Sequence, residues 1–250
     1  MLNTLTSALA TDGLMWIAFG TFLAGVVRGF SGFGTAMIYL PIAGQFLSPI
    51  EALITLTILD STGPIPALPR SAREADWPDL RRLSLAMIIC LPFGLLILLS
   101  VPEEVFRYAV SLISLGLLCA LIFGLRYQGR LSRNKVLGVG AFSGILGGSA
   151  GLPGPAVILF YMASTHPPHV IRATIMLFLF SFDVALMVIL SVQGLLTLQA
   201  VAIGVVLIVP MICGVVIGTW LFRPSYEKVY RTAAYVIIGV SAVRGLPIWG

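Results

Sequence analysis

The sequence contains few charged residues. Asp, Glu, Lys and Arg make up only 10% of its 250 residues, whereas a soluble domain carries about one quarter. Apolar residues make up 58%. This composition excludes an ordinary soluble domain. A transmembrane β-barrel is excluded as well, because the apolar stretches are continuous and do not alternate with polar residues at a period of two.

Side chains suited to catalysis and to metal binding are also scarce. The three cysteines have no metal-ligand spacing, and the two histidines stand in a proline-containing turn without Cys, Asp or Glu beside them. No nucleophile–base arrangement, phosphate loop or coenzyme fingerprint occurs. We therefore expect no enzymatic activity, no metal and no cofactor. The net charge of +5 is explained by basic loops on one side of a membrane, so we expect no nucleic-acid partner.

Long apolar stretches dominate what remains. Segments near 83–101, 105–125, 170–192, 199–222 and 230–247 each approach the roughly 20 residues that cross the hydrocarbon core of a bilayer. The sequence therefore predicts an all-α polytopic membrane protein, with residues 1–250 forming a single transmembrane domain in the lipid bilayer. The oligomeric state stays open.

The first half of the chain recurs in the second half at a shift of 119 residues. Residues 25–36 (GVVRGFSGFGTA) correspond to residues 144–155 (GILGGSAGLPGP), and Pro49 corresponds to Pro168. The two repeats cover about 14–125 and 135–247. Each predicts a pair of short helices broken by Gly or Pro, followed by three longer helices. The first of the three is expected at about 49–69 in the first repeat and about 168–192 in the second. Such broken segments at matching places in two halves of a transporter are the best sequence indication of a substrate site.

The positions of the basic residues favour one of two topologies. If each broken pair crosses the membrane once, Arg223, Lys228 and Arg231 lie on the side opposite the other basic loops. If each pair is a re-entrant hairpin, twelve of the fifteen basic residues lie inside, and only Arg107 and Arg244 lie outside. Each repeat then has an odd number of crossings. We therefore predict two inverted repeats, each with a re-entrant or broken helix pair plus three transmembrane helices, and keep fully spanning pairs as the alternative.

The broken pairs also supply the candidate binding residues. Glycines at their tips, and the positive ends of helices that begin near Phe33 and Pro153, are typical of an anion site. Arg28 can hold an anion through two donors. The alternatives are that the glycines only allow close helix packing and that Arg28 pairs with a carboxylate. The predicted substrate-binding residues are Arg28, Gly29, Ser31, Gly32, Phe33, Gly34, Thr35, Gly148, Ser149, Gly151, Pro153 and Gly154.

Two acidic residues lie inside predicted membrane helices. Asp60 and Asp183 are expected to face the protein interior, where such residues are rare and often functional. Both are candidates for coupling transport to protons, or else for pairing with Arg28. We interpret His166 and His169 as parts of a solvated turn, and Glu51 as a cap for the first turn of its helix.

Taken together, the Gly-rich segments 28–41 and 147–161 resemble those of the TauE/SafE family of sulfite exporters. The segments around Pro92 and Pro210, and the helix starts at 102–107 and 227–231, resemble that family too, so the similarity covers about 14–244. It implies a multi-pass permease of the bacterial inner membrane for small anions such as sulfite and organosulfonates. Members both import and export, so the resemblance fixes neither the substrate nor the direction.

We therefore expect a secondary transporter for a small anion, most simply sulfite, an organosulfonate or a carboxylate. The anion is expected at the midplane between the two Gly-rich tips and to move by alternating access. An anion channel or a non-transporting membrane scaffold is the alternative, although a channel predicts a continuous polar path and the predicted spans hold few acidic residues. An intramembrane enzyme would need a catalytic constellation, and the sequence contains none.

Overall fold

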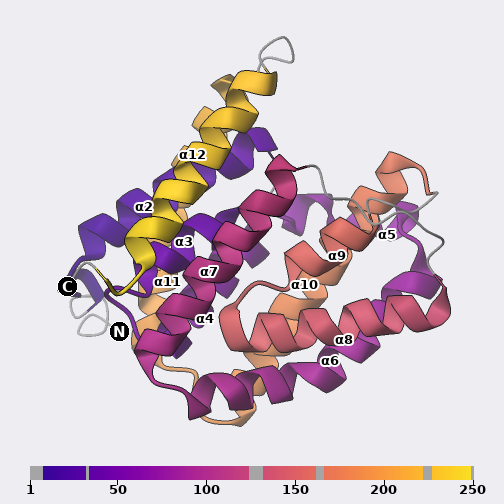
Figure 1. Cartoon of the computed structure of the whole chain (residues 1–250), viewed down its shortest axis with the longest axis horizontal. Helices are drawn as coiled ribbons and strands as arrows, with labels where there is room; N and C mark the ends of the chain where they lie inside the picture. Colours follow the sequence, from indigo (N-terminus) through magenta and orange to yellow (C-terminus); the bar gives the residue numbers. More distant parts are fainter. Residues whose placement is uncertain (1–7, 32–33, 124–131, 162–165, 222–226, 249–250) are drawn as a thin grey trace. The chain divides into compact units, whose positions relative to one another are not determined.

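The chain is helical throughout the part that the structure describes. The computed structural model covers residues 8–31, 34–123, 132–161, 166–221 and 227–248, and these contain no β-strand (Figure 1). Four helices are long and apolar enough to cross a membrane: α6 (Trp77–Ser100), α7 (Glu103–Ile122), α10 (Pro168–Val192) and α11 (Leu198–Leu221). The prediction of an all-helical membrane protein is confirmed at this level.

The remaining helices are shorter, and they include both broken pairs. In the first repeat, α2 (Leu14–Ser31) and α3 (Thr35–Ala43) form the pair, and α4 (Pro49–Thr62) follows. In the second repeat, α8 (Arg133–Ala150) and α9 (Gly154–Tyr161) form the pair, and α12 (Glu227–Gly245) is the last helix. The prediction carried the third segment to residue 69. The helix instead ends at Thr62, and η1 (Ile65–Ala67) and α5 (Leu68–Glu74) follow it, because prolines at 64, 66 and 69 interrupt the chain.

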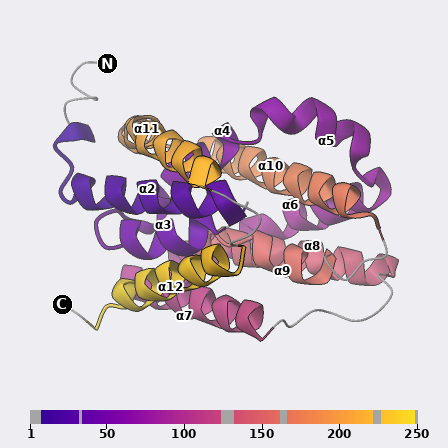
Figure 2. The same cartoon turned by 90° about the horizontal axis from the view of Figure 1, so that it is seen from above.

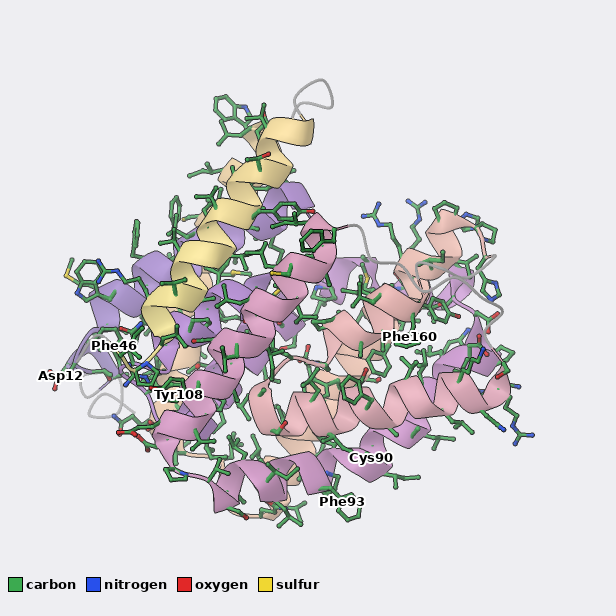
Figure 3. The ribbon with its side chains drawn as sticks, viewed as in Figure 1. Asp12, Phe46, Cys90, Phe93, Tyr108 and Phe160 are labelled. Atoms are coloured by element: carbon green, nitrogen blue, oxygen red, sulfur yellow. The ribbon has the colours of Figure 1, made fainter. Side chains whose placement is uncertain are left out.

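Large apolar side chains cover much of the outward surface of these helices. Phe93 on α6 is 58% exposed (Figure 3), and Trp220 on α11 is 81% exposed. In water such a surface would be costly, but in a bilayer it faces acyl chains. The exposure therefore agrees with the apolar composition in placing these helices in a membrane.

The chain forms two compact units. The described parts of Met1–Leu59, Pro102–Ile122 and Gly194–Gly250 make up unit 1, with α2, α3, most of α4, α7, α11 and α12. In this unit α2 packs along α11, and α12 packs along α7 and α3 (Figures 1 and 2). A Cβ atom added at Gly25 of α2 would lie 2.5 Å from the carbonyl oxygen of Met211 in α11. The two helix backbones therefore touch, which only residues without side chains permit.

Unit 2 contains the described parts of Asp60–Val101 and Phe123–Gln193, with η1, α5, α6, α8, α9 and α10. Here α8 lies along α6 (Figure 1). Gly144 of α8 packs against the backbone at Met87 of α6, and Gly94 of α6 packs against the carbonyl oxygen of Ile145. The crossing repeats the glycine-mediated packing of α2 on α11. Each broken helix pair therefore packs against a long helix of the other repeat.

Candidate functional site

The first broken pair changes direction at a glycine. Gly34 precedes α3 with φ of 96°, a left-handed conformation that is strained for residues with a side chain. Gly34 also has no side chain with which to cap α3, although the first N–H groups of a helix have no partner within it. The start of α3 is therefore a positive, donor-rich end in unit 1. The predicted residues Gly32 and Phe33, and the side chain of Ser31, lie outside the described residues.

Arg28 reaches across this break. It lies half-buried in the last turn of α2, and its Nη1 donates to Oγ1 of Thr35, the first residue of α3, at 3.5 Å. The guanidinium thus lies beside the N-terminus of α3. It also offsets the negative C-terminal end of α2, so it has a structural role in addition.

Contacts with α4 hold α3 in place. The buried Tyr39 donates from its hydroxyl to Oγ1 of Thr55 at 2.6 Å, which joins the middle of α3 to α4. At the start of α4, the Ser48 N–H donates to the Glu51 carboxylate at 3.0 Å, and the Glu51 N–H donates to the Ser48 hydroxyl at 3.4 Å. This reciprocal cap confirms the expected role of Glu51. The N-terminus of α3 is consequently carried on a fixed support.

The second broken pair has the same local construction in unit 2. Gly151, with φ of 69°, ends α8, and its N–H donates to the carbonyl oxygen of Gly147 at 2.8 Å. Pro153 is buried, and α9 then begins at Gly154. Pro155 stands in the first turn of α9, where the missing N–H costs nothing. The start of α9 is therefore a second positive helix end next to a left-handed glycine.

Helix α10 packs against this second tip. A Cβ atom at Gly147 would collide with the Phe182 ring, and one at Gly154 would lie 3.4 Å from Cδ2 of Leu179. Asp183 follows Phe182 and lies one turn beyond Leu179, on the same side of α10. Its side chain is buried, with 7% of the residue exposed, in agreement with an interior-facing carboxylate. Asp60, in the last turn of α4, is half-buried.

Three of the predicted binding residues have other contacts. Gly29 packs against the backbone of α11, where an added Cβ would lie 2.5 Å from the carbonyl oxygen of Val215. Gly148 likewise packs against the carbonyl oxygen of Leu91 in α6, at 2.5 Å. The hydroxyl of Ser149 donates to the carbonyl oxygen of Ile145 at 2.8 Å. Helix packing therefore accounts for these two glycines. The donors left as candidates for binding a ligand are the backbone N–H groups at the starts of α3 and α9.

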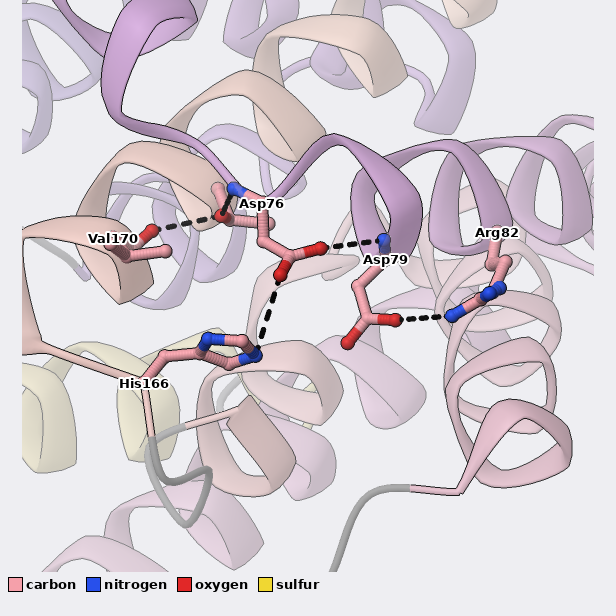
Figure 4. A network of polar contacts seen from close by, with 6 residues as sticks. Asp76, Asp79, Arg82, His166 and Val170 are labelled. Carbon is pink, nitrogen blue, oxygen red and sulfur yellow. Dashed lines mark hydrogen bonds and ion pairs between the residues drawn. The ribbon is translucent and has the colours of Figure 1, made fainter.

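Sequence reasoning missed one polar contact. His166 was assigned to a solvated turn, yet its Nε2 lies 3.5 Å from Oδ2 of Asp76, at the start of α6 in the other repeat (Figure 4). The partners are 90 positions apart, and neither stands in a recognisable motif. The available signal was that both residues lie at the ends of predicted spans, on the same side of the membrane if the broken pairs are re-entrant.

The comparison with known families places the chain as a whole. The family described as "Sulfite exporter TauE/SafE" matches residues 17–245, which includes α2 from Ile17 onward and every described helix from α3 to α12. No match was found among curated proteins or among solved structures.

Proposed function

The chain belongs to the TauE/SafE sulfite exporter family, and on that premise we propose that it is a secondary transporter of a small anion in the bacterial inner membrane. The family and the four apolar spans support a membrane transporter. The family consists of transporters and not of enzymes.

The observation that carries the proposal is that the N-terminus of α3, which receives no side-chain cap from Gly34, lies beside Arg28. Backbone N–H groups and a helix dipole attract negative charge at this end, and a guanidinium adds a full positive charge. Nη1 of Arg28 lies 3.5 Å from Oγ1 of Thr35, so both side chains can contact one small anion. We assign anion binding to Arg28, Gly34 and Thr35, and a matching set of backbone donors to the start of α9 at Gly154.

The chemistry of these donors favours a compact oxyanion. Sulfite, a sulfonate or a carboxylate presents two or three oxygens to N–H donors, and a guanidinium fork can hold two of them. The first turn of α3 adds backbone donors that point in one direction. The predicted acidic residues Asp60 and Asp183 are the candidates for coupling this movement to protons.

The repeat suggests how the anion crosses. We propose that the broken pairs are re-entrant and that the two repeats are inverted, as the basic residues of the sequence predict. Each broken pair packs against a helix of the other repeat, so a movement of one repeat displaces the broken pair of the other. This supports alternating access, in which the binding residues open to one side of the membrane at a time.

Ligand binding to purified protein is the direct test. We expect sulfite, a small sulfonate or a small carboxylate to raise the melting temperature in detergent, because a ligand that binds only the folded state stabilises it. Chloride at equal ionic strength is the control. Protein reconstituted into vesicles should then exchange labelled anion against unlabelled anion at equal pH. Conduction without such counterflow would indicate a channel, and neither binding nor flux would indicate a scaffold.

A further inference from the structure

The inward face of α7 in unit 1 carries buried polar atoms without partners. Arg107, Ser111 and Ser114 follow one another at intervals of four and three residues, so they lie on one side of the helix. Nε of Arg107 and the hydroxyls of both serines are buried, and none of these atoms has a hydrogen-bond partner among the described residues. Each serine is 0% exposed. Buried polar atoms are normally hydrogen-bonded, so this face is expected to meet a ligand.

This face of α7 lies against α3 and α12 (Figures 1 and 2). A Cβ atom added at Gly44, which follows the last residue of α3, would lie 3.8 Å from Cγ of Arg107. One added at Gly245 of α12 would lie 2.8 Å from Oγ of Ser111 and 2.5 Å from Cβ of Pro41 in α3. The polar row therefore borders the end of α3 on one side and α12 on the other. We call this contact region the α7 seam.

Helices α7 and α12 run in opposite directions along the α7 seam. Gly245 meets Ser111, whereas a Cβ atom at Gly239, nearer the start of α12, would lie 3.3 Å from Cδ2 of Leu118. Ser114 lies between these two contacts in the sequence. At both points a glycine of α12 faces a side chain of α7, while the backbones of α2 and α11 touch directly. Side-chain adjustments therefore allow α12 to slide on α7, as packed helices do in shear movements.

Arg107 gives the α7 seam a positive charge. The residue is half-buried, and within the described part of the chain it forms no ion pair with a carboxylate. The acidic residues closest to it in sequence, Glu103 and Glu104, are exposed in the first turn of α7. The guanidinium offsets the negative C-terminal end of α3 in part. A charged donor without a carboxylate, on the same face as two hydroxyls that can donate, suits an anion and not a cation.

We propose that Arg107, Ser111 and Ser114 form a second binding station for the transported anion, at the opposite end of α3 from Arg28. Arg28 lies beside the first residue of α3, and Arg107 packs where that helix ends. The 9 residues of α3 span about 13 Å at 1.5 Å per residue. An anion that leaves Arg28 is taken up at the other end of the same short helix when α12 moves away from α7. This inference rests on the proposed anion transport and adds the next step of the path.

Thiol chemistry tests whether anions reach the α7 seam. Ser111→Cys and Ser114→Cys would each be made in full-length protein without its native cysteines, since the exchange changes the side chain little. Protein in detergent would be treated with 2-sulfonatoethyl methanethiosulfonate, an anion, and with 2-(trimethylammonio)ethyl methanethiosulfonate, a cation. Each rate is divided by the rate of the same reagent with a small free thiol. Ser143→Cys is the matched control, because Ser143 of α8 is also 0% exposed and its hydroxyl has no partner among the described residues.

We expect both seam cysteines to react about tenfold faster or more with the anionic reagent than with the cationic one, because a positive site concentrates anions. Methanesulfonate should slow the anionic reaction, and Arg107→Gln should remove the preference. Ser143→Cys should react with neither reagent. No reaction at positions 111 and 114 would overturn the proposal, since the seam would then stay closed and dry. Equal normalised rates for the two reagents would overturn it as well, because they indicate a water-filled crevice that does not select anions.

A second measurement covers the case in which a cysteine variant folds poorly, and it separates this station from the site at Arg28. Methanesulfonate would be added to Arg28→Gln protein, with chloride at equal ionic strength as the control. We expect methanesulfonate still to raise the melting temperature by about 1–3 °C. Adding Ser111→Ala and Ser114→Ala together should remove this increase, and adding Ser143→Ala should not.

The outcomes distinguish the two sites. If methanesulfonate stabilises wild type but not Arg28→Gln protein, the second station is overturned and the site at Arg28 stands. If Arg28→Gln protein binds the anion as tightly as wild type and the seam cysteines prefer the anionic reagent, the second station stands and the site at Arg28 is wrong.

Discussion

Replacing Arg28 with Gln tests the proposed binding residues most directly. Gln keeps a hydrogen-bonding side chain but removes the positive charge and the fork of donors that suits an oxyanion. A hydrogen bond to a charged group contributes about 1.5–3 kcal/mol, so we expect the dissociation constant for the best anion to rise about 10- to 150-fold. Losing the bond to Thr35 adds little, because 3.5 Å is long for a hydrogen bond.

The dissociation constant would be measured by titrating purified protein with the anion, with calorimetry or the ligand-dependent melting temperature as the readout. Arg28→Lys should recover only part of the affinity, since a point charge cannot reproduce two parallel donors. Arg244→Gln is the matched control, because Arg244 is exposed and also lies in the last turn of its helix. It should bind as wild type does.

The structural role of Arg28 predicts a different pattern. If the arginine acts only by stabilising the C-terminal end of α2, then Arg28→Gln lowers the melting temperature without ligand and leaves the affinity of the folded protein unchanged. A variant that melts like wild type and binds the anion with an unchanged dissociation constant would refute the assignment of Arg28 to the site.

Three further predictions concern packing, coupling and topology. Gly144→Ala should lower the melting temperature by several degrees, because the new Cβ meets the α6 backbone at Met87 and overpacking costs about 1–3 kcal/mol. Gly138 lies in the same helix with open space around it, so Gly138→Ala should leave the stability of the protein unchanged or raise it by up to about 1 kcal/mol. If the two variants have the same melting temperature, Gly144 is not required for the close approach of α8 and α6. Asp183→Asn should abolish accumulation driven by a pH gradient but spare counterflow at equal pH in vesicles, whereas loss of both activities would identify a structural carboxylate. Single cysteines at positions 73, 128 and 226, in a chain without its native cysteines, should all resist an impermeant thiol reagent in intact cells; labelling at position 226 alone would favour fully spanning broken pairs.

Helix positions could be predicted from the sequence wherever apolar length and proline agreed. The segment predicted at 168–192 is the observed α10, because Pro167 and Pro168 mark its start and polar residues follow its end. The end of α4 was predicted too late, since the apolar residues near Ile65 continue the hydrophobic pattern while the surrounding prolines interrupt the helix. Hydrophobicity and backbone continuity are separate properties, and only the prolines indicated that the helix ends.

The sequence predicted the two broken helix pairs but not the contacts of the individual residues in them. Both a ligand and a neighbouring helix require a residue without a side chain, so the sequence could not distinguish binding from packing at Gly29 and Gly148. The structure separates them, because these glycines face the backbones of α11 and α6, while Gly34 and Gly151 occupy left-handed turns. Contacts such as that of His166 with Asp76 depend on which helix ends meet, and the repeat pattern does not contain that information.

The two tips differ in a way that bears on how the anion is recognised. Arg28 occupies the last turn of α2, and the residue that corresponds to it in the second repeat is Gly147. A side chain could not be added there, because even a Cβ at Gly147 would collide with the ring of Phe182. The space that Arg28 uses beside the first tip is thus filled by an aromatic ring beside the second, and Asp183 follows that ring. Symmetric repeats therefore carry an asymmetric pair of tips, with a cation at one and a buried carboxylate at the other. Under the proposed transport function, we therefore expect anion binding to depend on the first tip and coupling to depend on the second.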